Sequence, residues 1–237
     1  CVPLFLLLSG YLSSKKKISK SYFKKIIPFF SIYVLASLAC MVYKVIATDL
    51  PFSIVGFITH TLNYSNCYYA WYVEMYLGLF LLIPFLNIMY HGLDSKRKKQ
   101  LMILIFMIVT SLPKIFNVFT LNPYDLLNPA ASGEYAQILP DYWCDMYPLT
   151  YYLIGCYLSE YKINIKSRYI FIISTLFLIL NGSFNYYRSH GAVFVWGDWQ
   201  NYFSPLVFVQ SVLFFIFFVN LDYSKFPQKL AKVFKLM

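Results

Sequence analysis

A series of apolar runs of about the length of a membrane-crossing helix is the feature that most constrains this chain. The runs cover residues 26–45, 68–90, 101–119, 143–158, 169–184 and 202–220. A helix needs about 20 apolar residues to cross the ~30 Å hydrocarbon layer of a bilayer. The composition agrees, because 59% of the residues are hydrophobic and 13% charged, against roughly 45–50% and about 25% in soluble domains. The sequence therefore predicts an all-α, polytopic bundle of transmembrane helices.

The positive charge of the chain is unevenly distributed between the connections. Of the 20 Lys and Arg residues that give the net charge of +10, all but Lys44, Lys114 and Arg188 fall in every second connection or in the basic end. They lie in the stretches 15–25, 96–99, 162–168 and 225–235. Lys and Arg gather in the cytoplasmic loops of membrane proteins. We therefore expect these stretches to be cytoplasmic, with membrane lipid as a partner and no role for nucleic acid.

The chain shows no separate soluble domain, so we expect residues 1–237 to form a single transmembrane domain. The apolar stretch 1–12 is too short to cross a bilayer and begins without Met. It is therefore interpreted as the second half of a helix. The basic stretch at the other end would be followed by a further span. Both ends of this domain are thus expected to be truncated.

The cysteines and histidines were considered as metal ligands and as reactive groups. The five cysteines have no metal-ligand spacing, so no metal site is predicted. Cys67 and Cys144 each fall near the outer end of a predicted span, where they would either pair in an oxidising space or remain unpaired. His60, His91 and His190 are expected in loops, in contact with solvent.

Short motifs occur in order along nearly the whole chain. They are Pro3-Leu4-Phe5 with Ser9-Gly10-Tyr11-Leu12, Phe23-Lys24-Lys25 with Pro28, Trp71-Tyr72 with Leu77-Gly78 and Pro84, Tyr151-Tyr152 with Gly155, and Ser204-Pro205-Leu206 with Gln210-Ser211. In order, spacing and loop charge this series resembles membrane acyltransferase family 3. The family consists of bacterial proteins that transfer acetyl or other short acyl groups to surface sugars.

The resemblance implies an O-acyltransferase of the bacterial plasma membrane. It would move an acyl group, expected to be acetyl, from acyl-coenzyme A to a hydroxyl of a cell-surface polysaccharide or related glycan. The chain departs from the family pattern at two positions, with Lys24-Lys25 in place of Lys-Arg and Tyr69 in place of a His. The Arg and the catalytic His of the family lie on a first helix, which is expected to precede residue 1. Residues 1–237 expressed alone are therefore expected to be inactive.

Lys24 and Lys25 are the predicted binding residues for the acyl-coenzyme A donor. They fall at the expected cytoplasmic start of the run 26–45. There the side-chain charge would add to the free backbone N–H groups of a helix N-terminus, which bind phosphate. The alternative is that the two lysines serve only the orientation of the span.

Glu74 is the predicted catalytic residue, as a wall of the acceptor site or as a partner that orients the missing His. An ionisable group about one turn inside a span is costly and often functional. Trp71, three residues earlier, shares its helix face and is predicted to bind substrate. The alternatives are that Glu74 reaches the outer surface or pairs with Arg188.

Asp145 is the second predicted substrate-binding residue. Asp141 and Asp145 are four residues apart, beside Trp143 and Tyr147. The two carboxylates would share one face if the helix begins that early, and this group would suit a sugar. Pro148 allows a later start, because proline prefers the first turn of a helix.

Two other functions remain open from the sequence. A transporter or flippase for glycan or lipid-linked substrates should show paired halves with helices broken by Gly or Pro at corresponding positions, and no such pairing is visible. A non-catalytic membrane subunit is the other alternative.

Overall fold

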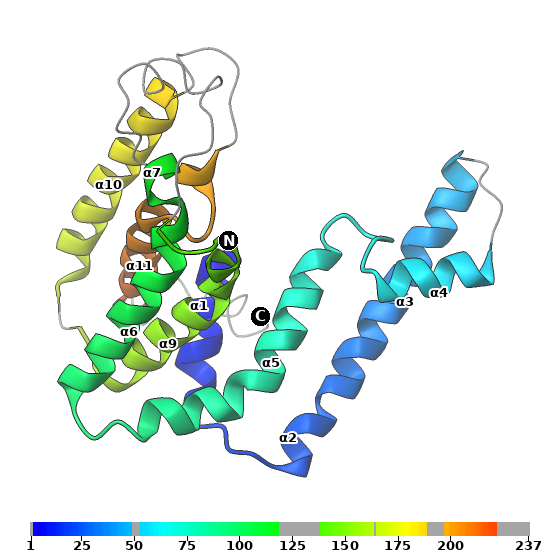
Figure 1. The fold of residues 1–237 in the computed structure, drawn as a ribbon, viewed down its shortest axis with the longest axis horizontal. Helices are drawn as coiled ribbons and strands as arrows, with labels where there is room; N and C mark the ends of the chain where they lie inside the picture. The colour runs from blue at the N-terminus through cyan, green and yellow to red at the C-terminus, as the bar shows by residue number, and fades with distance from the viewer. Residues whose placement is uncertain (1, 49–52, 119–137, 164, 189–196, 222–237) are drawn as a thin grey trace, which may run out of the picture. The chain divides into compact units, whose positions relative to one another are not determined.

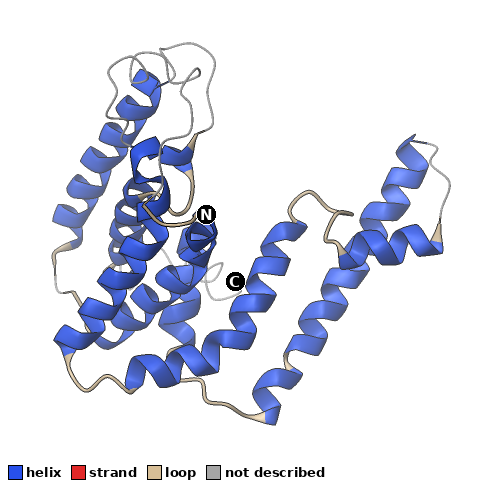
Figure 2. Ribbon diagram, viewed as in Figure 1, coloured by secondary structure: helices blue, strands red, loops and turns tan. Residues whose placement is uncertain are grey.

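The computed structural model describes residues 2–48, 53–118, 138–163, 165–188 and 197–221. Within these ranges the chain is helical and contains no strand (Figure 2), which confirms the predicted all-α class. The elements are α1 (Val2–Ser13), α2 (Lys20–Lys24), α3 (Ile26–Thr48), α4 (Ile54–Leu62), α5 (Ala70–His91), α6 (Lys96–Ser111), η1 (Leu112–Lys114), α7 (Ile115–Val118), η3 (Asp141–Met146), α9 (Tyr147–Glu160), α10 (Ser167–Arg188), η4 (Asp198–Gln200) and α11 (Pro205–Val219).

Among the described helices, four are long and apolar enough to cross a membrane. They are α2 with α3 (Lys20–Thr48), α5, α10, and η4 with α11 (Asp198–Val219). Residues 101–118 of the predicted span 101–119 are helical, as α6 and α7 joined by the 3-10 turn η1 that contains Pro113; residue 119 lies outside the described residues. Proline removes a backbone hydrogen bond from a helix, so the predicted interruption at this residue is confirmed.

The chain divides into two compact units. The first unit comprises residues 13–94, and the second unit comprises residues 1–12 with 95–237. In the first unit the ring of Tyr22 on α2 stacks on Phe80 of α5, with 4.5 Å between ring centroids. The Tyr22 hydroxyl also donates a 2.7 Å hydrogen bond to the Phe80 carbonyl oxygen. These two contacts join the α2–α3 region to α5.

At the other end of the first unit, a buried polar network connects α3, α4 and the loop before α5. The Asn66 amide donates to the hydroxyls of Ser37, at 2.6 Å, and Thr61, at 3.0 Å. The Tyr33 hydroxyl donates to the Thr61 carbonyl oxygen at 2.7 Å. Because buried polar groups are costly unless hydrogen-bonded, this network fixes the three segments together.

In the second unit, α9 forms the centre of the core. Tyr151, Tyr152 and Leu153 are fully buried, and Tyr151 stacks on Phe208 of α11 with 4.3 Å between ring centroids. Next to them, α10 and α11 lie side by side (Figure 1).

The helices α1 and α9 of the second unit cross at two glycines. A β-carbon on Gly155 would overlap the Leu7 carbonyl oxygen and lie 3.0 Å from the Gly10 α-carbon. A β-carbon on Gly10 would likewise overlap the Tyr152 carbonyl oxygen. Small residues allow helix backbones to approach in this way in membrane proteins.

Several predicted boundaries are wrong. The basic connection at 91–100 was expected to be a loop, but α6 begins at Lys96 because Ser95 caps it, accepting from the Lys98 N–H at 3.3 Å. Residues 54–62, expected in a polar connection, form α4 behind the N-cap Ser53. The α-helical part of the predicted span 143–158 starts only at Tyr147, with Pro148 in its first turn.

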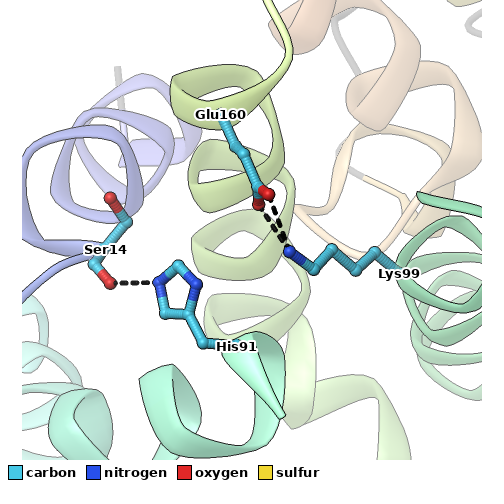
Figure 3. Close-up of polar contacts among 4 residues, drawn as sticks. All are labelled: Ser14, His91, Lys99 and Glu160. Atoms are coloured by element: carbon cyan, nitrogen blue, oxygen red, sulfur yellow. Dashed lines mark hydrogen bonds and ion pairs between the residues drawn. The ribbon is translucent and has the colours of Figure 1, made fainter. Parts of the chain in front are cut away.

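A lysine in the first turn of α6 is unfavourable next to the positive end of the helix dipole. The Lys99 side chain nevertheless lies buried there, because its ammonium group is 2.8 and 2.7 Å from the two Glu160 carboxylate oxygens. Figure 3 shows this ion pair between α6 and the end of α9. The pair holds these two helices together at the end of α9.

The membrane orientation can be tested with single cysteines in a variant that lacks the five native ones. We expect a cysteine at Lys166, in a basic connection, to be protected from a membrane-impermeant maleimide in intact cells. A cysteine at Tyr68, which is 87% exposed before α5, should react. Both should react after permeabilisation. Labelling of the Lys166 position in intact cells would contradict the assignment of the basic connections to the cytoplasm.

Candidate functional site

A cavity of about 520 Å³ lies in the first unit, where the end of α5 meets the segment after α1. Its volume is within the range typical of small-molecule sites. We call it the basic cavity. Its lining consists of Ser14, Lys15, Lys16, Lys17, Ile18, Asn87, Ile88 and His91.

The wall of the basic cavity is built from hydrogen bonds between α5 and the segment 13–16. Asn87 is buried, and its side-chain amide donates to the carbonyl oxygens of Ser13 and Lys16, both at 2.8 Å. Carbonyl groups at the end of a helix lack partners within the helix. Asn87 thus supplies partners at the end of α1 and fixes the backbone that carries the lysines.

His91 makes a second connection of the same kind. Its Nε2 lies 2.8 Å from the Ser14 carbonyl oxygen, as Figure 3 shows. A carbonyl can only accept, so the Nε2–H of His91 donates to it. This hydrogen bond fixes the His91 ring against the backbone of the lysine segment.

The charges around the basic cavity are positive. Lys15, Lys16 and Lys17 are exposed, and their ammonium groups are flexible point charges. Backbone and side chains together thus form a cavity suited to an anionic ligand of small-molecule size.

The predicted donor residues Lys24 and Lys25 lie elsewhere, at the junction between α2 and α3, and do not line the basic cavity. Their expected place at a free helix N-terminus is wrong. The helix begins at Lys20, Ser19 caps it by accepting from the Tyr22 N–H at 3.0 Å, and the Lys25 N–H donates to the Tyr22 carbonyl. A donor role for Lys24 and Lys25 stays a prediction.

Glu74 and Trp71 lie on α5, three residues apart as predicted. Glu74 is exposed and Trp71 is half-buried against Tyr72, with 6.2 Å between ring centroids. The Glu74 carboxylate interacts electrostatically with Tyr64 in the loop before α5. Burial, and then the negative charge of Glu74, raise the pKa of the Tyr64 hydroxyl. Nothing in these contacts assigns Glu74 or Trp71 to a reaction, so both remain predictions.

Asp141 and Asp145 do not share a face of an α-helix, because both lie in the 3-10 helix η3. Asp141 pairs with Lys114, whose ammonium nitrogen is 2.8 Å from Oδ2 of Asp141. Asp145 is exposed. The α-helix starts later, at Tyr147, as the position of Pro148 allowed. Substrate binding by Asp145 stays a prediction.

A smaller cavity of about 180 Å³ lies in the second unit between α10, η4 and α11. We call it the amide cavity. Asn185 Oδ1 accepts from the Trp199 indole N–H and from the Gln200 amide, both at 2.6 Å. Its lining consists of Asn181, Phe184, Asn185, Trp199, Gln200, Leu206 and Val207.

Asn181 and Asn185, which line the amide cavity, belong to a polar face of α10. Ser174, Asn181, Asn185 and Arg188 are spaced by seven, four and three residues, which places them on the same face of a helix. The Arg188 guanidinium is buried with its carbon 4.4 Å from the centre of the Trp199 ring. Polar residues inside a transmembrane bundle often mark functional sites. The spacing of these residues follows the helical period and is a signal that the sequence itself contains.

The expectation that the histidines lie in loops is wrong for two of them. His60 lies in α4 and His91 ends α5, whereas His190 lies outside the described residues. His60 Nδ1 is 2.9 Å from the Ser65 hydroxyl. His60 and Ser65 line a third cavity of about 500 Å³ in the first unit. Its other lining residues are Met41, Lys44, Val45, Ser53, Gly56 and Asn66.

Metal binding was also considered. In the described part of the chain, no group of three or more His, Cys, Asp or Glu residues is placed to hold a metal ion.

In comparison with known proteins, a family model described as an acyltransferase domain matches residues 1–236. No curated protein and no solved structure matches.

Proposed function

The chain belongs to membrane acyltransferase family 3, and on that premise we propose which groups it transfers. The donor is acyl-coenzyme A and the group is expected to be acetyl. The acceptor is a hydroxyl of a cell-surface polysaccharide or related glycan. The protein acts as a multi-pass enzyme of a bacterial plasma membrane.

The basic cavity is the observation that carries the proposal for the donor. Coenzyme A carries phosphate groups and is made in the cytosol, and Lys15, Lys16 and Lys17 lie in a stretch expected to be cytoplasmic. Lysine ammonium groups bind phosphate as point charges. Since Asn87 and His91 fix the backbone of this segment, the charges are held near the cavity before a ligand arrives.

In the proposed reaction the acceptor hydroxyl oxygen attacks the carbonyl carbon of the thioester. The C–O bond forms, the C–S bond breaks, and coenzyme A leaves as a thiolate that takes up a proton. A base must remove the hydroxyl proton. The family resemblance gives this role to a His, and Glu74 is proposed to orient that His or to form a wall of the acceptor site. The lysines of the basic cavity contribute binding rather than proton transfer.

The amide cavity supports the proposal for the acceptor. It lies at the Arg188 end of α10, opposite the basic connection that precedes Ser167, so the predicted topology places it outside. Its lining combines Trp199 with the side-chain amides of Asn181 and Asn185. Amides offer both donors and acceptors to hydroxyl groups, and an aromatic ring offers an apolar face. We propose that this cavity binds one sugar residue of the acceptor.

The donor proposal is tested by comparing two charge-neutralising pairs. We expect Lys16→Gln with Lys17→Gln to raise the KM for acetyl-coenzyme A about tenfold, equivalent to about 1.4 kcal/mol of binding, with little change in kcat. The comparison pair, Lys24→Gln with Lys25→Gln, removes the same charge outside the cavity and tests the alternative donor site that the sequence predicts. If the donor binds in the basic cavity, this pair leaves KM near the wild-type value. Higher salt should reduce the difference, because ions screen exposed charges.

Two results would contradict different parts of this proposal. An increase in KM for the Lys24 and Lys25 pair alone would move the donor site from the basic cavity to the α2–α3 junction. If the full-length protein in membranes transfers no acyl group from acetyl-coenzyme A to any glycan fraction, the proposed donor and acceptor are wrong, although membership of the family stands.

A further inference from the structure

Two cysteine sulfurs lie in direct contact in the first unit. Cys40 is on α3, Cys67 is in the loop before α5, and their sulfur atoms are 2.7 Å apart. Both side chains are partly accessible, and both are free thiols in this structure. Neither the sequence motifs nor the acyltransferase function assigns a role to this pair.

The contact is fixed by the buried polar network beside it. Asn66, the neighbour of Cys67, donates to Ser37, which lies one helical turn before Cys40 on α3. Asn66 also donates to Thr61 of α4, and Tyr64 makes the turn between them with a positive φ of 53°. The positions of the two sulfurs are therefore set by hydrogen bonds on both sides.

The pair lies far from the basic end of α3. Cys40 follows Ile26 by 14 residues, a rise of about 21 Å along a helix. Lys20, Lys24 and Lys25 precede this helix on the side predicted to be cytoplasmic. The predicted topology therefore places the cysteines near the outer surface, in a compartment where disulfides form and persist.

We infer that Cys40 and Cys67 form an intramolecular disulfide that fixes the outer end of α3 to the start of α5. The oxidant is the disulfide of a thiol–disulfide oxidoreductase in the outer compartment. One thiolate of the pair attacks that disulfide to give a mixed disulfide, which the second thiolate then attacks. The new S–S bond forms, two electrons pass to the oxidoreductase, and its two cysteines leave as thiols.

The protonation of Cys67 explains why a catalysed reaction is needed. Burial, and then the Cys40 sulfur beside it, raise the pKa of the Cys67 thiol to about 11. At neutral pH the reactive thiolate is then scarce, so spontaneous oxidation is slow.

The disulfide would also affect the third cavity. It would close the loop that contains α4 and His60, and so restrict the movement of the side chains that line this cavity. This consequence does not depend on which substrate the enzyme uses.

The inference is tested on the full chain by trapping thiols in intact cells with acid, followed by denaturation, alkylation with N-ethylmaleimide and peptide mass spectrometry. We expect a peptide pair joined through Cys40 and Cys67 that separates on reduction. Cys144 and Cys156, which are buried in the second unit, should be alkylated and serve as internal controls.

Single substitutions give a second measurement that does not require detection of the linked peptide. In wild-type cells a membrane-impermeant maleimide should label neither cysteine of the pair. In Cys40→Ser it should label Cys67, and in Cys67→Ser it should label Cys40. A host without its outer thiol oxidoreductase should yield the reduced pair. Complete alkylation of both cysteines in the wild type, or a linkage of Cys67 to Cys144, would overturn the inference.

Discussion

Replacing Gly155 by leucine should prevent α1 from packing against α9 and cause the largest loss of stability of any single change discussed. A β-carbon at this position would overlap the Leu7 carbonyl oxygen and lie 2.9 Å from the Tyr11 amide nitrogen. These neighbours are backbone atoms, which cannot move away as a flexible side chain would. Extra atoms in a packed core typically cost about 1–3 kcal/mol and occasionally more.

The effect of Gly155→Leu can be measured as a lower midpoint of thermal unfolding in detergent and a lower protein level in membranes. The matched control is Gly182→Leu on α10, where a β-carbon would meet no atom within 4 Å. This control should behave like the wild type. Equal stability of the two variants would show that α1 and α9 do not cross at these glycines.

A tryptophan in place of Val207 should block the amide cavity. Val207 lines this cavity of about 180 Å³, and an indole ring would fill most of the space proposed for a sugar. We expect acyl transfer to the glycan to fall at least roughly tenfold, or about 1.4 kcal/mol, through a higher KM for the acceptor. Hydrolysis of the acyl donor by water should be unchanged, because water needs no cavity of this size.

The control for Val207→Trp is Val209→Trp, two residues further along α11, where the side chain is 40% exposed. Asn181→Ala tests the same cavity without the risk that a bulky side chain disturbs the fold, since it removes one amide and adds no volume. The loss of one hydrogen bond is worth about 0.5–1.5 kcal/mol, so this variant should raise the acceptor KM by roughly two- to tenfold. Normal transfer by both cavity variants would mean that the acceptor binds elsewhere.

The helical class and the positions of the long helices followed from the sequence, because a bilayer requires long apolar runs whatever their neighbours are. The ends of the helices were less predictable. Ser95 is a typical N-cap, but the four basic residues after it were interpreted as a loop. Residues 54–62 are apolar enough for a helix, but polar residues flank them on both sides, so the whole segment resembles a polar connection.

The cavities were harder to predict than the helices. The basic cavity depends on Asn87, whose bonds to Ser13 and Lys16 join residues more than 70 positions apart. Nothing local to either segment indicates this contact. For the same reason, the sequence suggested Cys144 and not Cys40 as a possible disulfide partner of Cys67. The stripe of polar residues on α10 was accessible to sequence analysis, since its spacing follows the helical period.

The short length of α9 has a consequence for the bilayer itself. Its 14 residues rise about 21 Å, less than the ~30 Å of a typical hydrocarbon layer. The six residues of η3 add about 12 Å, so a crossing of full thickness built on α9 includes them. A crossing by α9 alone would leave a hydrophobic mismatch, which local thinning of the bilayer meets. In that case η3 would place Asp145 and the ion-paired Asp141 at the thinned edge.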